Sequence, residues 1–449
     1  MRDTILVGCG AGFSGDRTDA ALPVVKTLIR RSGPAALIFE NLGERTLAQQ
    51  QLSKRNNSKM GYEPLMELEL RPILADCLAN GITIVGNFGA ANPTAAGQRI
   101  LEMAQELGLP RPKVAIVSGD DLSDGHGKEL IAQHLGEQFD QARFVCANAY
   151  QGAHEIAAAI AAGAQIVVTG RVSDPSLTLG PVIAHYGWSI DDWDLLAGAS
   201  MAGHLLECGA QVTGGYFADP GKKNVSGMEN IGFPIAEIFA DGTCLISKAD
   251  NSGGLVDVRT VKEQLLYEVH DPSAYITPDV VADISDAEVA ELEPNVVRLS
   301  GVKGHPRTDT LKANVFFDGG WLGEGEISYA GPNARARAEL ALQTLKKRLG
   351  MLHGLELRCD LIGVCSVFND DANRMLDSIA IGEPTDVRAR VAAQHLELEP
   401  IEALLREVTA LWTCGPAAGG GVRVNKRQRL STTSCLLKRE YLPATFEFL

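Results

Sequence analysis

Near its start the chain carries the stretch that decides its fold: Thr4-Ile-Leu-Val-Gly8, followed directly by Cys9-Gly-Ala-Gly-Phe-Ser-Gly-Asp-Arg17. The first part is an apolar run typical of a buried strand, and the second is a glycine-rich turn that leads into a helix. Such a turn leaves backbone N–H groups unpaired and directs a helix N-terminus at one place, which favours anion binding. The stretch therefore predicts a small-molecule pocket beyond a first strand.

From residue 1 to about 170, short β-branched runs alternate with longer segments of helical periodicity, the pattern of βαβ units on a parallel sheet. The expected strands are Thr4–Val7, Ala36–Phe39, Ile82–Gly86, Lys113–Ser118, Arg143–Cys146 and Gln165–Thr169. The expected helices between and after them are Thr18–Arg30, Pro64–Ala79, Pro93–Leu107, Gly127–Leu135 and Gly152–Ala162. We therefore predict an α/β fold with an open, mostly parallel sheet and helices on both faces.

Beyond about residue 180 the alternation breaks into a helix at Ser200–Cys208 and a hairpin with its turn at Asp241-Gly242. A smaller α+β region follows, with strands expected at Val296–Ser300, Thr310–Phe316 and Glu324–Tyr329 and helices at Arg337–Arg348 and Pro400–Leu411. The length of 449 residues is enough for more than one core. We predict two domains: a ligand-binding α/β domain over residues 1–276 and an α+β domain over residues 277–449.

Charge and composition exclude several classes of function. The net charge of −15 would repel a phosphate backbone, so the sequence predicts no nucleic-acid binding. Nine cysteines without a C-x-x-C pair are typical of reduced thiols in the cytoplasm, where we expect the protein. No apolar stretch approaches the roughly 20 residues that cross a bilayer, which predicts no membrane insertion.

Polar residues follow every one of the six expected strands. In open α/β sheets ligands bind beyond the carboxyl ends of the strands, because loops and helix N-termini converge there. The predicted substrate-binding residues at these strand ends are Gly10, Gly12, Phe13, Ser14, Asp16, Arg17, Glu40, Asn87, Asn92, Ser118, Asp121, Asn148 and Tyr150. Short polar residues at turns also cap helices, so capping is the alternative for each of these positions.

Two groups of residues are candidates for catalysis. His204, Glu207 and Cys208 share one helical face, where a carboxylate can orient an imidazole for acid–base work. Arg171, which follows a strand, could hold a carboxylate or thioester oxygen, and Asp174 or Asp120 could take a proton. We expect Cys208 to contact substrate. The alternatives are a polar helix end for the first group and helix capping for Asp174.

A nicotinamide cofactor is a weaker alternative. The spacing Gly8-x-Gly10-x-Gly12 departs from G-x-G-x-x-G, although Glu40 closes the second strand where a ribose-binding acid would lie. The His204 group lacks H-E-x-x-H spacing, so we expect no metal site. No nucleophile elbow or P-loop is present, which argues against hydrolase and kinase chemistry.

Several longer motifs resemble the acyclic terpene utilisation (AtuA) family over nearly the whole chain. They are Gly10-Ala-Gly-Phe-Ser-Gly-Asp-Arg17, Gly89-Ala-Ala-Asn-Pro93, Ser118-Gly-Asp-Asp121, Gly170-Arg-Val-Ser-Asp-Pro175, Gly203-His-Leu-Leu-Glu-Cys-Gly-Ala-Gln-Val-Thr-Gly-Gly-Tyr216, Glu263-Gln-Leu-Leu-Tyr-Glu-Val-His-Asp-Pro272 and Gly323-Glu-Gly-Glu-Ile-Ser-Tyr-Ala-Gly-Pro332. The resemblance implies catabolism of branched isoprenoid acyl-CoA esters. It also implies a short form that lacks the C-terminal ferredoxin-like segment of longer members, with a separate small ferredoxin-fold protein as partner.

Together these observations predict a lyase, either a hydro-lyase or an aldol-type carbon–carbon lyase, that acts on a small or branched hydroxy acid or its CoA thioester. His204 with Glu207 would act as acid and base, Arg171 would bind the carboxylate, and the turn Gly10–Ser14 would hold an anion. No cofactor is required in this hypothesis, and CoA enters only as part of the substrate. A homo-oligomer is expected. The alternatives are a non-catalytic ligand-binding or scaffold subunit and an NAD-linked oxidoreductase.

Overall fold

The computed structural model describes residues 4–350, 355–378 and 384–449. The chain forms two compact units. Unit 1 comprises Met1–Asp140, Val145–Phe316 and Thr433–Leu449, and unit 2 comprises Gln141–Phe144 and Phe317–Thr432. Within the described ranges, none of the helices has the length and apolar composition that crossing a bilayer requires.

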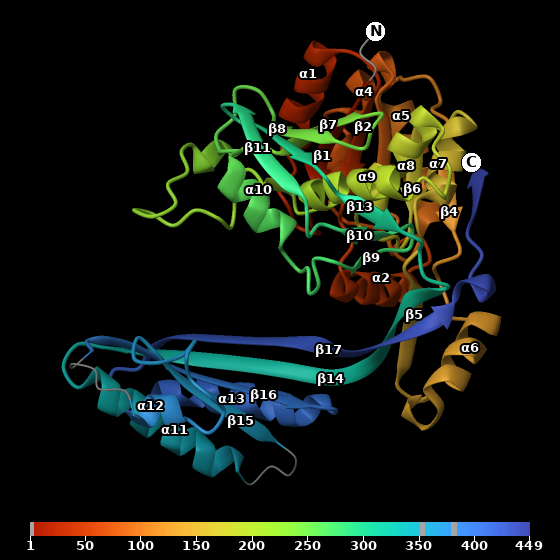
Figure 1. Cartoon of the computed structure of the whole chain (residues 1–449). Helices are drawn as coiled ribbons and strands as arrows, with labels where there is room; N and C mark the ends of the chain where they lie inside the picture. Colours follow the sequence, from red (N-terminus) through yellow and green to blue (C-terminus); the bar gives the residue numbers. More distant parts are fainter. Residues whose placement is uncertain (1–3, 351–354, 379–383) are drawn as a thin grey trace. The chain divides into compact units, whose positions relative to one another are not determined.

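A ten-stranded sheet forms the centre of unit 1 (Figure 1), in the order β11-β12-β8-β7-β1-β2-β3-β6-β4-β18. Its parallel part consists of β1 (Thr4–Ala11), β2 (Ala35–Phe39), β3 (Thr83–Gly86), β6 (Ile166–Thr169) and β4 (Val114–Ser118). The antiparallel strands are β7 (Pro234–Phe239), β8 (Cys244–Lys248), β11 (Glu288–Glu293), β12 (Val296–Ser300) and β18 (Thr445–Phe448). All residues of β1 and β2 are buried, as strands covered on both faces must be.

Helices pack against this sheet. Those that touch its strands are α1 (Ala21–Arg31), α4 (Leu74–Asn80), α5 (Pro93–Glu106), α7 (His154–Ala161), α8 (Ser176–Tyr186), α9 (Trp193–Glu207) and α10 (Val258–Leu265). α1 buries Val24, Val25 and Leu28 on one face, and α5 begins where the Asn92 side chain accepts from the N–H of Ala95, with Pro at the first turn. The predicted α/β class is confirmed.

The strands expected up to residue 170 are all present, but one of them lies outside the parallel sheet. β5 (Phe144–Ala149) pairs with β14 (Thr310–Ala330) instead of joining β4 and β6. The helix that precedes it, α6 (Gly125–Leu135), buries only Ile131, so it has no apolar face with which to cover the sheet as a crossover helix does. Our expectation of a sixth parallel strand was therefore wrong.

Three short strands and two further helices also belong to unit 1. β9 (Tyr275–Ile276), β10 (Val281–Asp283) and β13 (Lys303–His305) form a small sheet of order β13-β10-β9, of which β10 and β13 pack on α9. α2 (Glu44–Asn56) and α3 (Met66–Leu70) follow β2 in the chain.

Unit 2 is a four-stranded antiparallel sheet with two main helices. Its elements are the second part of β14, α11 (Ala334–Leu349), β15 (Glu356–Ile362), α12 (Arg374–Ser378), β16 (Asp386–His395), α13 (Leu398–Cys414) and β17 (Gly420–Lys438). The strand order is β15-β16-β14-β17. Leaving out the single turn of α12, the sequence of elements is βαββαβ, which defines the ferredoxin-like arrangement.

Unit 2 corrects one expectation. The strands that we separated at Thr310–Phe316 and Glu324–Tyr329 are one continuous strand, β14. Asp318-Gly-Gly320, where Gly320 has a φ of +74°, has the composition of a turn, but the strand continues through it. The βαββαβ order lies within residues 317–432, in the region where we expected an α+β fold.

The division into units also differs from the expected domains 1–276 and 277–449. Residues 277–316 remain in unit 1, because β11 and β12 extend the large sheet and β10 and β13 pack on α9. The chain returns to unit 1 at residue 433, and β18 pairs with β4 at the far edge of the sheet.

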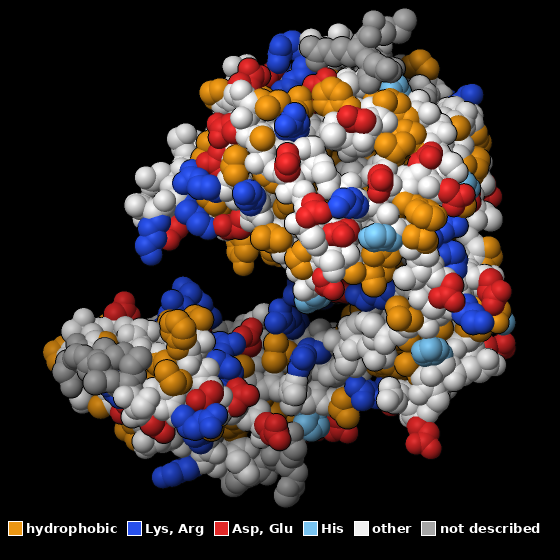
Figure 2. All heavy atoms as spheres, in the orientation of Figure 1, with side chains coloured by type: hydrophobic (Ala, Val, Ile, Leu, Met, Phe, Trp, Pro, Cys, Tyr) orange, Lys and Arg blue, Asp and Glu red, His pale blue; other side chains and the backbone are white. Residues whose placement is uncertain are grey.

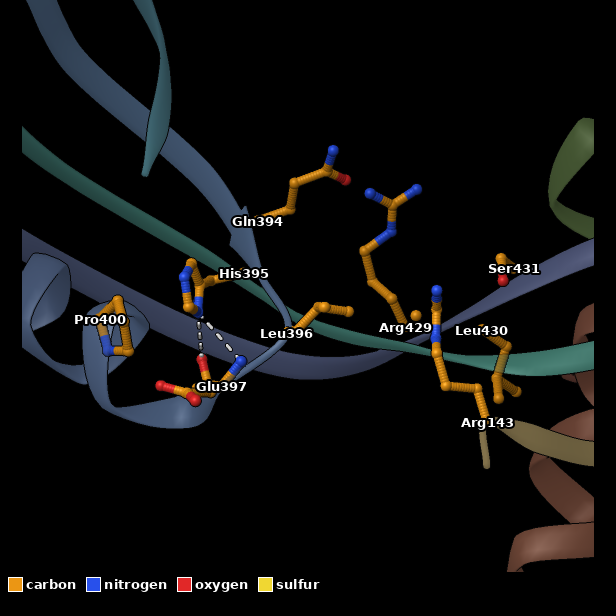
Figure 3. Close-up of a pocket in the computed structure, with 10 residues that line it drawn as sticks. Arg143, Gln394, His395, Leu396, Glu397, Pro400, Arg429, Leu430 and Ser431 are labelled. Atoms are coloured by element: carbon orange, nitrogen blue, oxygen red, sulfur yellow. Dashed lines mark hydrogen bonds between the residues drawn. The ribbon is translucent and has the colours of Figure 1, made fainter. Parts of the chain in front are cut away.

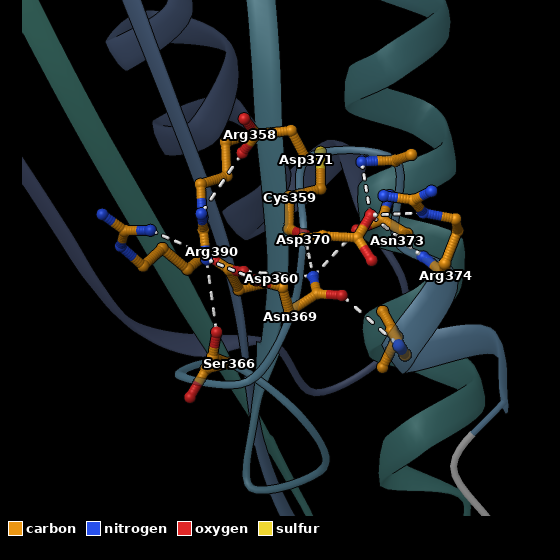
Figure 4. A network of polar contacts seen from close by, with 12 residues as sticks. Arg358, Cys359, Asp360, Ser366, Asn369, Asp370, Asp371, Asn373, Arg374 and Arg390 are labelled. Atoms are coloured by element: carbon orange, nitrogen blue, oxygen red, sulfur yellow. Dashed lines mark hydrogen bonds and ion pairs between the residues drawn. The ribbon is translucent and has the colours of Figure 1, made fainter.

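A buried carboxylate organises one face of the sheet in unit 2 (Figure 4). Asp360 accepts hydrogen bonds from Nη1 of Arg390 at 2.7 Å and from Nε of Arg358 and Nδ2 of Asn369, each at 3.2 Å. Arg358 also donates to the carbonyl oxygen of Ser366 at 3.3 Å. Two guanidinium groups thus balance one buried charge, and the network fixes the loop after β15.

Candidate active site

A cavity of about 430 Å³ lies in unit 1 beyond the ends of β2 and β6. Its walls come from the segments that follow these two strands, from the segment after α10 that leads into β9, and from the start of β14. The charged and phenolic side chains that line it are Glu44, Tyr150, Arg171, Asp174, Glu268, Tyr275 and Lys312. The cavity is therefore polar and carries both signs of charge.

Arg171 is the most buried charged group of this cavity, with a side chain only 3% exposed. Its Nε donates to the carbonyl oxygen of Val172 at 2.8 Å, Nη1 donates to the carbonyl oxygen of Leu42, and Nη2 pairs with Asp174. The guanidinium carbon lies 4.5 Å from the ring centroid of Tyr150. These contacts hold a positive charge in one orientation at the cavity wall, which suits a carboxylate or thioester oxygen.

A second polar group surrounds Glu44. Its Oε1 accepts from Tyr150 Oη and Asn314 Nδ2, each at 2.9 Å, and lies 3.2 Å from Lys312 Nζ. Burial acts to raise the pKa of Glu44, but the three donors outweigh it, so the pKa is lowered. Burial raises the pKa of Tyr150 to about 12. Glu44 is therefore ionised and Tyr150 protonated near neutral pH.

The expected pair of His204 and Glu207 forms on α9, but behind the cavity wall. Nδ1 of His204 lies 2.9 Å from Oε1 of Glu207, and His204 is 1% exposed. Burial lowers and the Glu207 carboxylate raises the pKa of His204, with an upward net shift. Among the described residues, neither Nε2 of His204 nor Oε2 of Glu207 has a hydrogen-bond partner. The pair is thus buried and incompletely satisfied.

Tyr275 connects this pair with the cavity. Its Oη lies 3.5 Å from Nδ1 of His204, the two ring centroids are 5.2 Å apart, and Tyr275 lines the cavity. Burial and the charges of Glu207 and Glu268 raise the pKa of Tyr275 well above its usual value. Tyr275 therefore stays protonated and can present an O–H group to a ligand.

Behind the segment that leads from β2 to α2 lies a network of buried acids and amides. Oε1 of Glu40 accepts from Asn87 Nδ2 and from the N–H of Leu42, each at 2.9 Å, and Asn41 Nδ2 donates to Glu69 at 3.1 Å. Burial and the charge of a neighbouring glutamate raise the pKa of Glu69 to about 8. Burial also raises the pKa of Glu40. Glu40 is thus held by internal donors.

Asp120 and Asn148 support Arg171 from behind. Oδ2 of Asp120 accepts from the backbone N–H of Arg171 at 2.8 Å and from Nδ2 of Asn148 at 2.9 Å. Burial raises the pKa of Asp120 to about 6. Both side chains are buried and neither lines the cavity. They position the loop after β6.

In the glycine-rich turn, backbone N–H groups donate to the carboxylate of Asp16. Oδ2 of Asp16 accepts from the N–H of Gly12 at 2.9 Å, and Oδ1 accepts from the N–H of Arg17 at 2.7 Å. Gly12 is also tightly packed, because a Cβ there would lie 2.4 Å from the backbone nitrogen of Gly209. The N–H of Gly12, in the turn that we expected to bind a substrate anion, thus already binds Asp16. Gly10 likewise packs against the ring of Phe39.

The other predicted binding residues lie away from this cavity. Asn92 donates to the carbonyl oxygens of Ser58 and Met60 and caps α5. Ser118 pairs with the edge strand β18. The remaining positions, none of which lines the cavity, are Phe13, Ser14, Arg17, Asp121 and Cys208. Their roles in binding stay predictions.

Of the charged and phenolic residues that line the cavity, our predicted site left out Glu44, Glu268, Tyr275 and Lys312. Lys312 is brought there through the pairing of β5 with β14, since the N–H of Tyr150 donates to its carbonyl oxygen. Glu268 has a φ of +59°, a conformation that a non-glycine residue rarely adopts and that clusters at functional sites. The segment Glu263–Pro272 was the available signal.

By fold and site, the chain is an α/β protein whose mixed sheet ends at a charged cavity backed by a buried His–Glu pair, with a ferredoxin-like second unit. Comparison with family models gives its membership: the chain belongs to the family described as acyclic terpene utilisation family protein AtuA, which matches residues 5–448. Membership links it to acyclic terpene utilisation.

Other comparisons add little. A search of curated proteins found no match. Among solved structures, the de novo designed protein Ferredog-Diesel is similar at 17% identity, covering 24% of this chain and 85% of the designed chain with a TM-score of 0.16.

Proposed function

We propose that the chain is a lyase that eliminates water from, or cleaves a carbon–carbon bond of, a hydroxy acid or its CoA thioester in the cavity of unit 1. The observation that carries this proposal is the meeting of Arg171, Asp174 and Tyr275 in one cavity, with His204 and Glu207 behind Tyr275. Both reactions need an anion-binding cation, a base and a proton donor, and these residues supply them.

In the proposed elimination, the substrate's carboxylate or thioester oxygen lies next to Arg171 and Lys312, where developing negative charge is stabilised. Asp174, with a side chain 36% exposed, accepts the proton from carbon. Tyr275 donates its proton to the departing hydroxyl group, which leaves as water. His204 is then a positioning residue, because it is 1% exposed and reaches the cavity only through Tyr275.

The buried network argues against the NAD alternative. A dinucleotide-binding acid after the second strand must be free to bind ribose hydroxyls. Glu40 stands at that place, but its Oε1 is engaged by Asn87 and Leu42.

A ligand-binding subunit is the second candidate. It is favoured by the burial of His204 and Glu207, neither of which lines the cavity. The separate small partner that the resemblance implies stays a prediction.

The test is turnover of a panel of hydroxyacyl-CoA esters and free hydroxy acids, followed by enoyl absorbance and by acetyl-CoA release. We expect Tyr275→Phe to lower kcat by about 10²- to 10⁴-fold, the usual contribution of general acid catalysis, with little change in KM. Tyr216→Phe is the matched control, because Tyr216 is 86% exposed and lies outside the cavity. Ligand binding without turnover, with or without a small partner, would favour the binding subunit.

The pH profile tests the positioning role of the buried pair. The charge of Glu207 raises the pKa of Tyr275, so Glu207→Gln should move the alkaline limb of the pH–rate profile to lower pH. A purely structural role of Glu207 would lower activity without moving that limb.

A further inference from the structure

Unit 2 contains its own cavity, of about 770 Å³, which the proposed lyase reaction does not use. The residues that form it all belong to unit 2: Arg143 before β5, Gly319 in β14, the segment from the end of β16 into α13, and Arg429–Ser431 in β17. Figure 3 shows the side chains of Arg143 and Arg429 on one side of this cavity and the carboxylate of Glu397 at the opposite end.

Arg143 is fixed in the cavity wall. Its Nε and Nη2 donate to the carbonyl oxygen of Asp318 at 2.7 and 2.5 Å, and the N–H of Asp318 donates back to the carbonyl oxygen of Arg143 at 2.7 Å. The rings of Phe144 and Phe317 pack edge to face beside this pair. The guanidinium is thus oriented before any ligand arrives, which lowers the entropy cost of binding.

β14 and β17 approach each other closely at Arg429. A Cβ at Gly319 would lie 3.2 Å from the backbone of Arg429, so glycine lets β17 come near β14 here. Among the described residues, the Arg429 side chain forms neither a hydrogen bond nor an ion pair, and it is exposed. Figure 2 shows Lys and Arg side chains along the part of unit 2 that β17 forms. In a chain of net charge −15, such a grouping points to an anionic ligand.

The other residues that line the cavity can contact the part of a ligand that carries no phosphate. The N–H of Glu397 donates to Nδ1 of His395 at 3.0 Å, which holds the imidazole ring at the cavity wall. Within the described part of the chain, no side chain caps the N-terminus of α13. Leu396, Pro400 and Leu430 add apolar surface. The volume lies in the range of sites for ligands of nucleotide size.

We propose that this cavity binds a phosphorylated ligand of nucleotide size, with its phosphate groups held by Arg143 and Arg429 and its organic part against the apolar wall. Guanidinium groups favour phosphate because their N–H donors match its oxygens in pairs. The site lies wholly in unit 2, so it is independent of the lyase assigned to unit 1.

Calorimetric titration of the full chain with ADP, pyrophosphate and citrate tests the proposal. We expect ADP to bind more tightly than pyrophosphate or citrate, and Arg429→Gln to weaken ADP binding about tenfold or more, as loss of a charge-assisted hydrogen bond does. Arg427→Gln is the matched control, because Arg427 is an exposed arginine of the same strand that does not line the cavity. The Arg427→Gln chain should bind ADP as tightly as the unchanged chain does.

Three results would overturn the proposal. They are no heat of ADP binding at millimolar concentration, equal affinity in the Arg429→Gln and Arg427→Gln chains, or citrate binding as tight as that of ADP. Arg143→Gln is a second variant, with folding checked by circular dichroism, since this side chain also holds the Asp318 carbonyl group. Because the readout is binding, these outcomes are distinct from the presence or absence of lyase turnover.

Discussion

Replacing Arg171 by Met should destabilise unit 1 by about 3 kcal/mol. Met fills a similar space and keeps the contact with Tyr150, so the change removes mainly charge and donors. Two buried residues, Leu42 and Val172, lose the donor to their carbonyl oxygens. An unsatisfied buried group costs about 1–3 kcal/mol. Asp174 adds little, because its side chain is 36% exposed and water can solvate it.

Urea unfolding at pH 7, followed by circular dichroism, measures this loss. The matched control is Arg71→Met: the Arg71 side chain is 40% exposed, and it pairs with Glu106 at 2.5 Å on the surface. Exposed ion pairs contribute about 0–1 kcal/mol, so the control should change little. If Arg171→Met costs no more than Arg71→Met, the buried guanidinium contributes no net stability and our account of it is wrong.

Three further variants test other parts of the structure. Burial lowers and Glu207 raises the pKa of His204, with a net rise, so the charged form of His204 stabilises the fold. This stabilisation is complete below pH 6.5 and is lost as pH rises through the folded pKa. His204→Gln should therefore remove the fall of the urea midpoint with pH above pH 6.5. Glu69, with a pKa of about 8, makes stability fall between pH 4.5 and 8, and Glu69→Gln should remove that slope in urea titrations at several pH values. Gly320→Ala should cost about 2 kcal/mol or more in thermal unfolding, because φ is +74° and a Cβ would lie 2.3 Å from a carbonyl oxygen. Gly331→Ala is the control, because Gly331 also has a positive φ but a Cβ there would meet open space, so this change should cost only about 1–2 kcal/mol. Equal losses of stability in the two variants would contradict the predicted clash.

The parallel part of the sheet could be predicted because each of its strands is a short buried run bounded by glycine or polar residues. Thr4–Ala11 and Ala35–Phe39 are buried throughout, and this pattern is local. β5 has the same pattern, with all six residues buried. Its partner, β14, lies more than 150 residues further along, and nothing in the apolar pattern of β5 distinguishes the two pairings.

The site was predictable to the same extent. Arg171, Asp174 and Tyr150 follow strand ends, and the topology of an α/β sheet brings such loops together; all three line the cavity. Tyr275 and Lys312 arrive from β9 and β14, whose places depend on long-range pairing. The turn at Gly12 misled us because Asp16, which we placed among the binding residues, fills the anion position itself.

The pairing of β18 with β4 can form only late in translation. Ser118 of β4 meets Thr445 of β18, and all of unit 2 is translated between them. At about 5–20 residues per second, the ribosome needs about 15–70 s to travel from one strand to the other. During that interval β4 is an unpaired edge strand of the nascent sheet, and such an edge can pair with other chains. Protection of the β4 edge by a chaperone until translation reaches residue 448 would thus favour a high yield of folded protein.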